Sequence, residues 1–189
     1  MKKNEQLIYL TSNQVKFEVA KRVFEDTDIE LIQRSMPTPE IQSTEVAVVA
    51  EYSAKWAYEQ LHQPVIVTDA GLHISALKGF PGPFIKYINE WLSADDLLSL
   101  MKDKDNRQVV IKDCLSYCEA GKKPVTFCGE YHGTLSTVKG RGCGTPMEQI
   151  FIPSGFTATI SEISVDKMVT YWSSIGIWQQ FKSYLFART

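Results

Sequence analysis

The pattern of apolar and polar positions in the first half of the chain predicts strands that alternate with helices. An apolar run over 6–10 is followed, after Lys16, by apolar residues that recur at helical spacing. A short second strand is predicted over 29–33, and a long helix over 44–61, where apolar positions again follow the helical period. Alternation of this kind is typical of an α/β sheet with parallel strand pairing.

The clearest buried strand of the chain is predicted over 64–69 and ends at Asp69, before an Ala-Gly pair. In open α/β sheets the carboxyl ends of the strands face the ligand crevice, so an aspartate at such an end is well placed for chemistry. An Asp before a small residue also forms turns, and that simpler role stays open. A strand over 72–77, a rigid proline-glycine loop and a helix capped by Ser93 follow.

The second half of the chain is predicted to be richer in strands. Two long strands over 108–119 and 124–138 are joined by a turn and therefore form a hairpin. A short strand over 149–152 and a last helix that begins near Ser173 complete the pattern. We predict an α/β fold in which residues 1–189 form a single, two-lobed domain, with an elongated mixed central sheet flanked by helices and the active cleft between the lobes.

Composition narrows the class of protein. The chain has 189 residues, of which 44% are hydrophobic, enough for a sizeable core. Its 20 basic and 22 acidic residues give a net charge of −2, which argues against nucleic acid or an anionic membrane as a partner. No apolar run is long enough to span a bilayer, and the first residues lack a signal-peptide core, so we expect a cytoplasmic protein.

The cysteines show no spacing typical of a metal site. Cys114, Cys118, Cys128 and Cys143 lack a paired C-x-x-C arrangement, and we expect all four to be reduced thiols. Zinc binding or disulfides are the less favoured alternatives.

The stretch from Thr11 to Lys16 joins the first predicted strand to the first helix and is a candidate phosphate site. The start of a helix leaves backbone N–H groups unpaired, at the positive end of the peptide dipoles. Ser12 and Asn13 add short polar side chains there, and Lys16 can place its ammonium group against the same anion. Ordinary helix capping is the simpler explanation of this stretch taken alone. Lys55, off the apolar stripe of the second helix, is by its spacing an ordinary solvated lysine.

Taken together, the residues resemble the inosine triphosphate pyrophosphatase family over nearly the whole chain. Each motif is weak alone, but their order along the chain is specific. They are Thr11-Ser12-Asn13-x-x-Lys16, Glu40-Ile41-Gln42, Lys55, Asp69-x-Gly71-Leu72, Leu77-Lys78-Gly79-Phe80-Pro81-Gly82-Pro83-Phe84-Ile85-Lys86, Phe127-x-Gly129, Gly133, Arg141-Gly142-Cys143, Ile150-Phe151-x-Pro153-x-Gly155, Thr159-x-Ser161-Glu162 and Lys167.

The resemblance implies a two-lobed α/β homodimer that splits a nucleoside triphosphate into a monophosphate and pyrophosphate with Mg²⁺ or Mn²⁺. Glu40 and Asp69 would hold the metal ion, and Asp69 would also activate the attacking water, with Lys16 stabilising the charge on the phosphates. The residues implied as substrate contacts are Thr11, Ser12, Asn13, Lys16, Lys55, Lys86 and Lys167. Lys86 is otherwise an ordinary solvated loop lysine. The family usually acts on deaminated purine nucleotides such as ITP and XTP.

The sequence departs from the family pattern in two regions. Where family members generally have a second acid before the aspartate, this chain has Thr68, so metal binding would rest on Glu40 and Asp69 alone. The aromatic segment and the Ser-His-Arg triplet that read the purine base are replaced as well. The residues at those positions are Thr145-Pro146-Met147-Glu148-Gln149 and Tyr171-Trp172-Ser173.

Loss of these buried polar partners predicts altered base specificity. Met147, Tyr171 and Trp172 could supply stacking surface instead, and Glu148 could accept a hydrogen bond from an exocyclic amino group. The simpler alternative is that these residues only fill core space.

Two other functions remain open at this stage. A catalytically weak, nucleotide-binding homologue that serves as a sensor or partner subunit would also explain Thr68 and the lost triplet. The Maf-type pyrimidine nucleotide pyrophosphatases are less favoured, because their signature arginine after the first loop is absent and Lys16 stands there.

Overall fold

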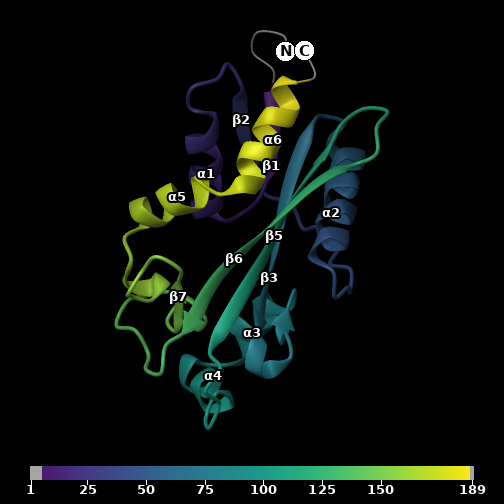
Figure 1. Cartoon of the computed structure of the whole chain (residues 1–189). Coiled ribbons are helices and arrows are strands. Elements are labelled where there is room, and N and C mark those ends of the chain that lie inside the picture. Colours follow the sequence, from purple (N-terminus) through teal and green to yellow (C-terminus); the bar gives the residue numbers. More distant parts are fainter. Residues whose placement is uncertain (1–5, 188–189) are drawn as a thin grey trace. The chain divides into compact units, whose positions relative to one another are not determined.

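The computed structural model describes residues 6–187 and has a mixed α/β fold, as predicted. Seven strands form a sheet of order β2-β1-β3-β5-β6-β7, with β4 paired to β3 (Figure 1). The chain divides into two compact units: residues 1–69, 113–129 and 169–189 form the first, and 70–112 and 130–168 the second. No helix in the described part of the chain is long and apolar enough to cross a membrane.

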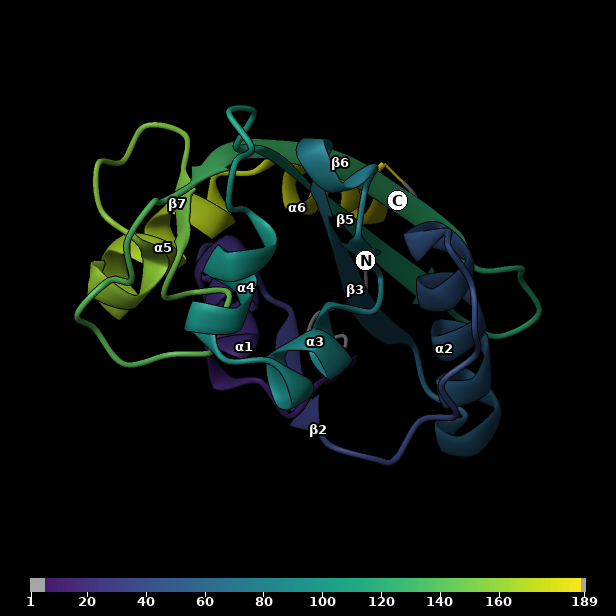
Figure 2. The same ribbon diagram turned by 90° about the horizontal axis from the view of Figure 1, so that it is seen from below.

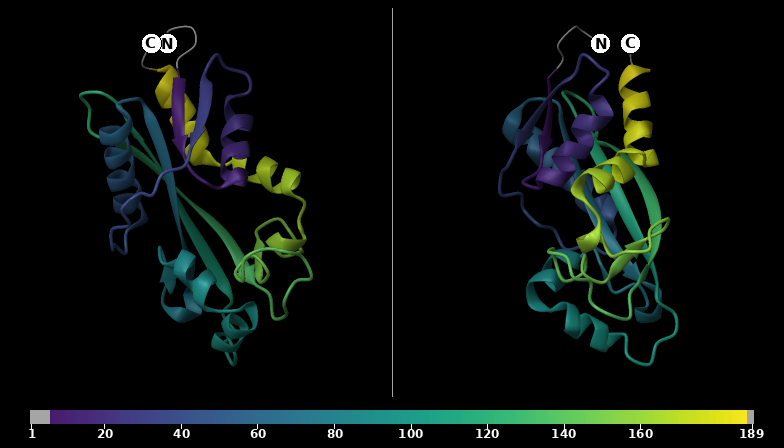
Figure 3. Two further views of the ribbon diagram at one scale, coloured as in Figure 1. Left: turned by 180° about the vertical axis from the view of Figure 1, so that it is seen from behind. Right: turned by 90° about the vertical axis from the view of Figure 1, so that its left-hand side faces the viewer.

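The first unit contains the parallel part of the sheet. Strand β1 pairs in parallel with β2 and with β3, which confirms the predicted parallel pairing. Figure 3 shows α1 and α6 close together beside β1 and β2. The elements that belong mainly to this unit are β1 (Gln6–Leu10), α1 (Gln14–Phe24), β2 (Glu30–Arg34), α2 (Val46–Leu61), α5 (Val165–Ser173) and α6 (Gly176–Phe186).

Strand alternation divides the core of the first unit into two layers. Tyr9, Ile66 and Leu115 belong to one cluster, which is covered by α1 and α6. Ile8, Val65 and Val67 belong to the other, which is covered by α2. Strand residues on one face of the sheet therefore pack against α1 and α6, and those on the other face pack against α2.

Three strands extend through both units. They are β3 (Val65–Ile74), β5 (Gln108–Cys118) and β6 (Val125–Leu135). The predicted hairpin of β5 and β6 is confirmed, with somewhat shorter strands. The prediction of separate strands over 64–69 and 72–77 is wrong, because β3 continues without a break through Ala70 and Gly71. Gly and Ala are disfavoured in strands, but this preference is weak and packing within the sheet overrides it here.

The second unit contributes the shorter elements. Its own elements are the 3-10 turns η1 (Ser75–Leu77) and η2 (Ile160–Glu162), strands β4 (Pro81–Gly82) and β7 (Phe151–Pro153), and helices α3 (Ile85–Trp91) and α4 (Ala94–Leu100). Figure 2 shows α3 and α4 as successive short helices. The predicted cap of α4 is confirmed, since Ser93 and Asp96 form a capping box. Helices α3 and α5 were not predicted.

Candidate functional site

The loop between β1 and α1 lies at the carboxyl edge of the parallel strands. The backbone N–H of Thr11 donates to the carbonyl oxygen of Arg34, the last residue of β2, at 2.8 Å. The side-chain amide of Gln33 also donates to the Thr11 carbonyl, at 3.2 Å. These bonds fix the first residue of the loop beside the end of β2. Ser12 and Asn13 are exposed beyond it.

Local hydrogen bonds shape this loop into a helix start. Asn13 is the N-cap of α1, and its side-chain oxygen accepts a hydrogen bond from the Lys16 N–H at 3.0 Å. The Thr11 hydroxyl oxygen in turn accepts from the Asn13 N–H at 3.1 Å. The remaining N–H groups of the first turn have no carbonyl within the helix to bond, and the turn contains no acidic residue. This end of α1 is therefore suited to an anion, with half-buried Lys16 in the same turn.

Asp69 lies on β3, next to β1 in the sheet. The β1–β3 pairs are Ile8↔Val65 and Tyr9↔Ile66, so β3 runs on past the paired part of β1 before it reaches Asp69. The prediction of Asp69 at a strand end is thus wrong for β3 itself. Strands β1 and β3 are parallel, so both run in the same direction past these pairs. The half-buried Asp69 on β3 and the Thr11–Asn13 loop after β1 therefore both lie beyond the carboxyl-terminal end of the paired region.

Thr68, which stands where the resemblance expects an acid, is bound to a buried tyrosine. Its hydroxyl oxygen is 2.6 Å from the hydroxyl oxygen of Tyr9, which is 0% exposed. Burial raises the pKa of Tyr9 well above its usual range, the hydrogen bond to Thr68 lowers it and the negative charge of Asp113 raises it further. Tyr9 therefore stays neutral and keeps its proton for hydrogen bonding. Sequence reasoning missed this contact and treated Tyr9 as an ordinary strand residue.

Glu40 and Lys55 belong to the same unit as Asp69. Glu40 is exposed in the segment between β2 and α2. Lys55 is exposed on α2; burial raises the pKa of the nearby Cys118 thiol, and the charge of Lys55 lowers that pKa in part. Within residues 6–187, no three His, Cys, Asp or Glu side chains gather as a protein-only metal cluster would. The approach of Glu40 and Lys55 to Asp69 stays a prediction.

Four of the predicted substrate contacts lie in the second unit, and three of them are at least partly exposed. Lys86 and Lys167 are exposed, and the Lys86 ammonium lies 5.6 Å from the centre of the Tyr87 ring. Glu148 is half-buried, and its carboxylate accepts a hydrogen bond from the Thr145 N–H at 2.7 Å. A carboxylate has further lone pairs, so this bond leaves Glu148 able to accept another.

Met147, the fourth predicted contact in the second unit, is only 3% exposed. It packs in the core of that unit with Leu97, Ile150 and Phe151. Its side chain therefore offers no surface on which a base could stack in this structure.

Tyr171 and Trp172, at the positions of the family's triplet, lie on α5. Their rings meet edge to face with centroids 4.8 Å apart, and Trp172 packs against the core of the first unit. Burial raises the pKa of Tyr171. The neighbouring Thr170 hydroxyl accepts a hydrogen bond from Arg22 of α1 at 2.8 Å, which ties α5 to α1. The two aromatic residues thus lie within the same unit as the Thr11–Lys16 loop.

Comparison with known proteins identifies the family. The model of the Ham1 family matches residues 7–171. The chain belongs to the Ham1 family. A Ham1-family relative from Methanopyrus kandleri, named dITP/XTP pyrophosphatase, is 35% identical over 161 residues, which are 85% of this chain and 86% of the relative. A relative of the same name from Thermococcus kodakarensis is 34% identical over 161 residues, again 85% of this chain and 86% of that one.

Solved Ham1 structures share the fold. The Staphylococcus aureus Ham1 protein aligns with 98% of this chain and 100% of its own, with a TM-score of 0.80 and 20% identity. The Coxiella burnetii HAM1 protein aligns over the same shares with the same TM-score and identity.

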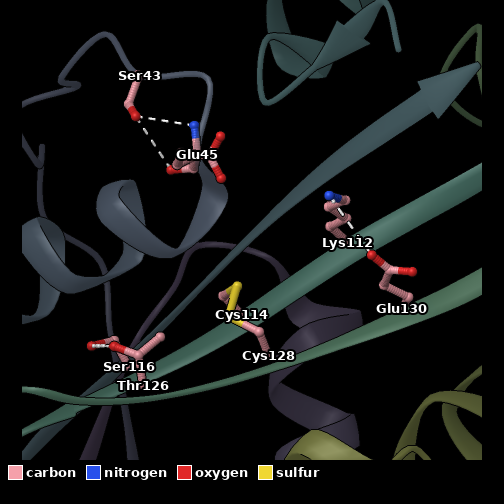
Figure 4. The surroundings of a disulfide bond; sticks show 8 residues. All are labelled: Ser43, Glu45, Lys112, Cys114, Ser116, Thr126, Cys128 and Glu130. Atoms are coloured by element: carbon pink, nitrogen blue, oxygen red, sulfur yellow. Dashed lines mark hydrogen bonds and ion pairs between the residues drawn. A yellow bond between two sulfur atoms is a disulfide. The ribbon is translucent and has the colours of Figure 1, made fainter.

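This Ham1-family chain carries a disulfide bond, which the sequence analysis gave only as a less favoured alternative. Cys114 on β5 is bonded to Cys128 on β6, so the expectation of four reduced thiols is wrong for this pair (Figure 4). Cys118 and Cys143 are free, as expected. Buried Cys114 packs against Val46 and Ala50 of α2, whereas Cys128 is exposed.

Cross-strand contacts on both sides of the disulfide show why it forms. The Ser116 and Thr126 hydroxyls are 3.0 Å apart, and the Lys112 ammonium lies 3.7 Å from the Glu130 carboxylate (Figure 4). Cysteines at the intervening position of each strand face each other directly, with Cα atoms 4.2 Å apart. The register that aligns them cannot be read from cysteine spacing alone.

Proposed function

We propose that this chain hydrolyses a nucleoside triphosphate to its monophosphate and pyrophosphate with the help of a divalent metal ion. The observation that carries the proposal is the polar loop that opens α1 at the carboxyl edge of β1, in the same unit as Asp69. Relatives named dITP/XTP pyrophosphatase, 35% and 34% identical to this chain, support the same class of reaction.

The β1–α1 loop would bind the triphosphate. A polyphosphate carries several negative charges, and transferring it from water into a site requires donors that are already in place. The first-turn N–H groups of α1 and the ammonium of Lys16 meet this need. Ser12 and Asn13, exposed in the loop, add polar contacts, and Lys55 and Lys167 complete the proposed phosphate contacts.

Asp69 would orient the attacking water and accept its proton. Its position on β3 next to β1 supports this role, because a rigid strand can hold a carboxylate in a fixed direction. The attack breaks the bond between the α-phosphorus and the bridging oxygen, and the electron pair leaves with pyrophosphate. Lys16 stabilises the negative charge that develops on the departing phosphates.

The residues present fit Mg²⁺ or Mn²⁺. Such ions bind carboxylate oxygens, and Mg²⁺ usually takes one or two carboxylates and fills its other positions with water and substrate phosphates. Glu40 and Asp69 would offer two hard oxygen ligands for such an ion. When bound, the metal ion would neutralise charge on the phosphate oxygens.

We also propose that base specificity differs from that of the named relatives. Tyr171-Trp172-Ser173 supplies no imidazole or guanidinium donor, and the Ser173 hydroxyl donates to the Thr170 carbonyl at 3.0 Å. Glu148 is the remaining acceptor that could select an exocyclic amino group. Met147 is not part of this proposal because it is buried. A homodimeric state, a cytoplasmic location and a substrate contact from Lys86 belong to the proposal as well.

The test is pyrophosphate release by the full-length chain with Mg²⁺, measured on a panel of natural and deaminated NTPs and dNTPs. Asp69→Asn keeps the shape of the side chain but removes its charge, and we expect it to lower kcat by about 100-fold or more. Asp105→Asn, in an exposed loop of the second unit, is the matched control and should retain activity.

Each result of the panel has a definite meaning. Full activity in Asp69→Asn would remove this residue from the mechanism. A clear preference for ITP, dITP or XTP would contradict the altered base specificity but keep the reaction class.

A catalytically weak nucleotide-binding homologue is the second candidate, favoured by the bond between Thr68 and Tyr9 where an acid is expected. It predicts that nucleoside triphosphates raise the melting temperature while no substrate on the panel is turned over.

A further inference from the structure

The hydroxyl group of Tyr9 is buried in the core of the first unit and has a specific partner. Tyr9 is 0% exposed, and its ring meets Trp178 edge to face with centroids 5.7 Å apart. A phenylalanine would fill the same apolar space without the cost of burying a hydroxyl. The hydroxyl instead forms a short hydrogen bond, 2.6 Å long, to the side chain of Thr68.

Thr68 precedes Asp69 on a part of β3 that has passed its pairing with β1. The β1–β3 pairs in the described residues are Ile8↔Val65 and Tyr9↔Ile66. Because Tyr9 lies opposite Ile66, its long side chain reaches along the strand to the next residue on the same face, which is Thr68. The hydroxyl contact thus continues the connection between the two strands beyond their backbone hydrogen bonds.

Strand geometry transmits this contact to Asp69. Successive side chains of a strand point to opposite faces, so Thr68 faces the layer of Tyr9 and Asp69 faces the other side. Holding the Thr68 side chain fixes its rotamer and the backbone from which the next residue projects. Because the threonine side chain is stiff about χ1, it can hold the adjacent backbone more firmly than a long, unbranched side chain could.

We propose that Tyr9 and Thr68 form a positioning pair that holds Asp69 in the direction needed for hydrolysis. The proposal rests on the proposed function of Asp69 and assigns no contact with substrate or metal to either residue. Thr68 thereby takes a role different from that of the acid expected at its position.

Three variants and a control test the pair. Tyr9→Phe and Thr68→Val each remove the bond, and we expect each to lower kcat about tenfold with KM within about twofold, since small misplacements of a reacting group reduce rate more than binding. The double variant should be no slower than either single one, because both remove the same contact. Thr68→Ser retains the hydroxyl and should keep most of the activity.

Tyr117→Phe is the matched control. Tyr117 is also buried, at 2% exposed, and its hydroxyl donates to the Glu119 carboxylate at 2.9 Å. The Tyr117→Phe variant should lower the melting temperature about as much as Tyr9→Phe does, but leave kcat unchanged. A purely structural role for Tyr9 would make the two variants alike in kcat, and that result would overturn the proposal.

A measurement without turnover separates this proposal from the proposed function. The carboxyl ¹³C signal of Asp69 should shift in Tyr9→Phe and in Thr68→Val, and stay in place in Tyr117→Phe. If the wild type releases no pyrophosphate from any triphosphate, the proposed function fails, and the ¹³C signal still decides the positioning. An unchanged signal in Tyr9→Phe would refute it.

Discussion

Removal of the Cys114–Cys128 disulfide offers the most direct energetic test of the structure. The bond joins neighbouring strands β5 and β6, and its buried half lies beneath the first turns of α2. Cys128→Ser is the appropriate perturbation, because Cys128 is exposed and a serine hydroxyl there stays in contact with water. Cys114 then remains as a small buried thiol in its apolar surroundings.

The expected loss follows from the length of the loop that the bond closes. Cys114 and Cys128 are 14 residues apart, and a loop of this size restricts the unfolded chain by about 3 kcal/mol in the chain-entropy treatment. Unfolded chains generally retain some local structure, which reduces this figure, so about 2–3 kcal/mol is our expectation. For a chain of this length, a loss of stability of that size corresponds to a melting temperature lower by about 4–12 °C.

Thermal and urea unfolding of the oxidised protein, with and without a phosphine reductant, measure the effect. Cys143→Ser, which changes an exposed free cysteine, is the matched control and should melt like the wild type. Reductant should lower the stability of the wild type and of Cys143→Ser but leave Cys128→Ser unchanged. Thiol labelling of the unfolded, oxidised wild type should count the two free cysteines, Cys118 and Cys143.

Two outcomes would refute this reasoning. Labelling of all four cysteines would show that the bond does not form. Equal unfolding midpoints for the wild type and Cys128→Ser, in a protein whose bond is confirmed by labelling, would show that the entropic estimate does not apply.

Two further predictions concern the second unit. Gly142→Ala should lower the melting temperature strongly, because a Cβ there would overlap the backbone carbonyl of Ser161; Gly176→Ala, whose Cβ would meet nothing nearer than 3.6 Å, should not. The pKa of Asp96 is lowered, chiefly by its hydrogen bond from the Ser93 side chain, so this cap stabilises the fold above the ordinary pKa of 3.8 and is lost as pH falls through the lower, folded value. Ser93→Ala should raise the Asp96 pKa in an NMR titration, and an unchanged value would contradict the cap.

Local patterns predicted the elements that have a clear apolar or capping signal. Strand β1, the β5–β6 hairpin, the cap at Ser93 and the last helix were all expected within a few residues of their observed bounds. The prediction of a turn at the Ala-Gly pair was wrong, because β3 continues through these residues as a strand. Neighbouring strands stabilise that backbone, and their contribution does not appear in the local sequence.

Helices α3 and α5 were missed for a related reason. Helix α3 has 7 residues and follows a proline-glycine loop, so it is too short to show a helical period. Helix α5 runs from Val165 to Ser173 and includes the stretch that was interpreted only through its resemblance to a base-reading triplet. Its packing against α1, through Arg22 and Thr170, is a tertiary contact and leaves no mark on the spacing of apolar residues.

The candidate site likewise contains features that the local sequence predicted and features that it did not. The start of α1 was predictable, because its signal is local: Asn13 caps α1 and Lys16 lies in the same turn. Tyr9 and the disulfide were missed, since both depend on which residues of neighbouring strands lie opposite each other. A tyrosine within an otherwise apolar strand was the available signal for Tyr9, because a buried phenol needs a hydrogen-bond partner.

Strand register therefore underlies both the Tyr9–Thr68 contact and the disulfide. Moving β1 by one residue against β3 would turn Tyr9 away from Thr68, and moving β5 by one residue against β6 would place Cys114 and Cys128 on opposite faces. Each pair consists of side chains that bond only in the observed register, and each adds a side-chain connection between neighbouring strands. At Thr68, where the resemblance leads us to expect an acid, the hydroxyl finds a partner on the adjacent strand.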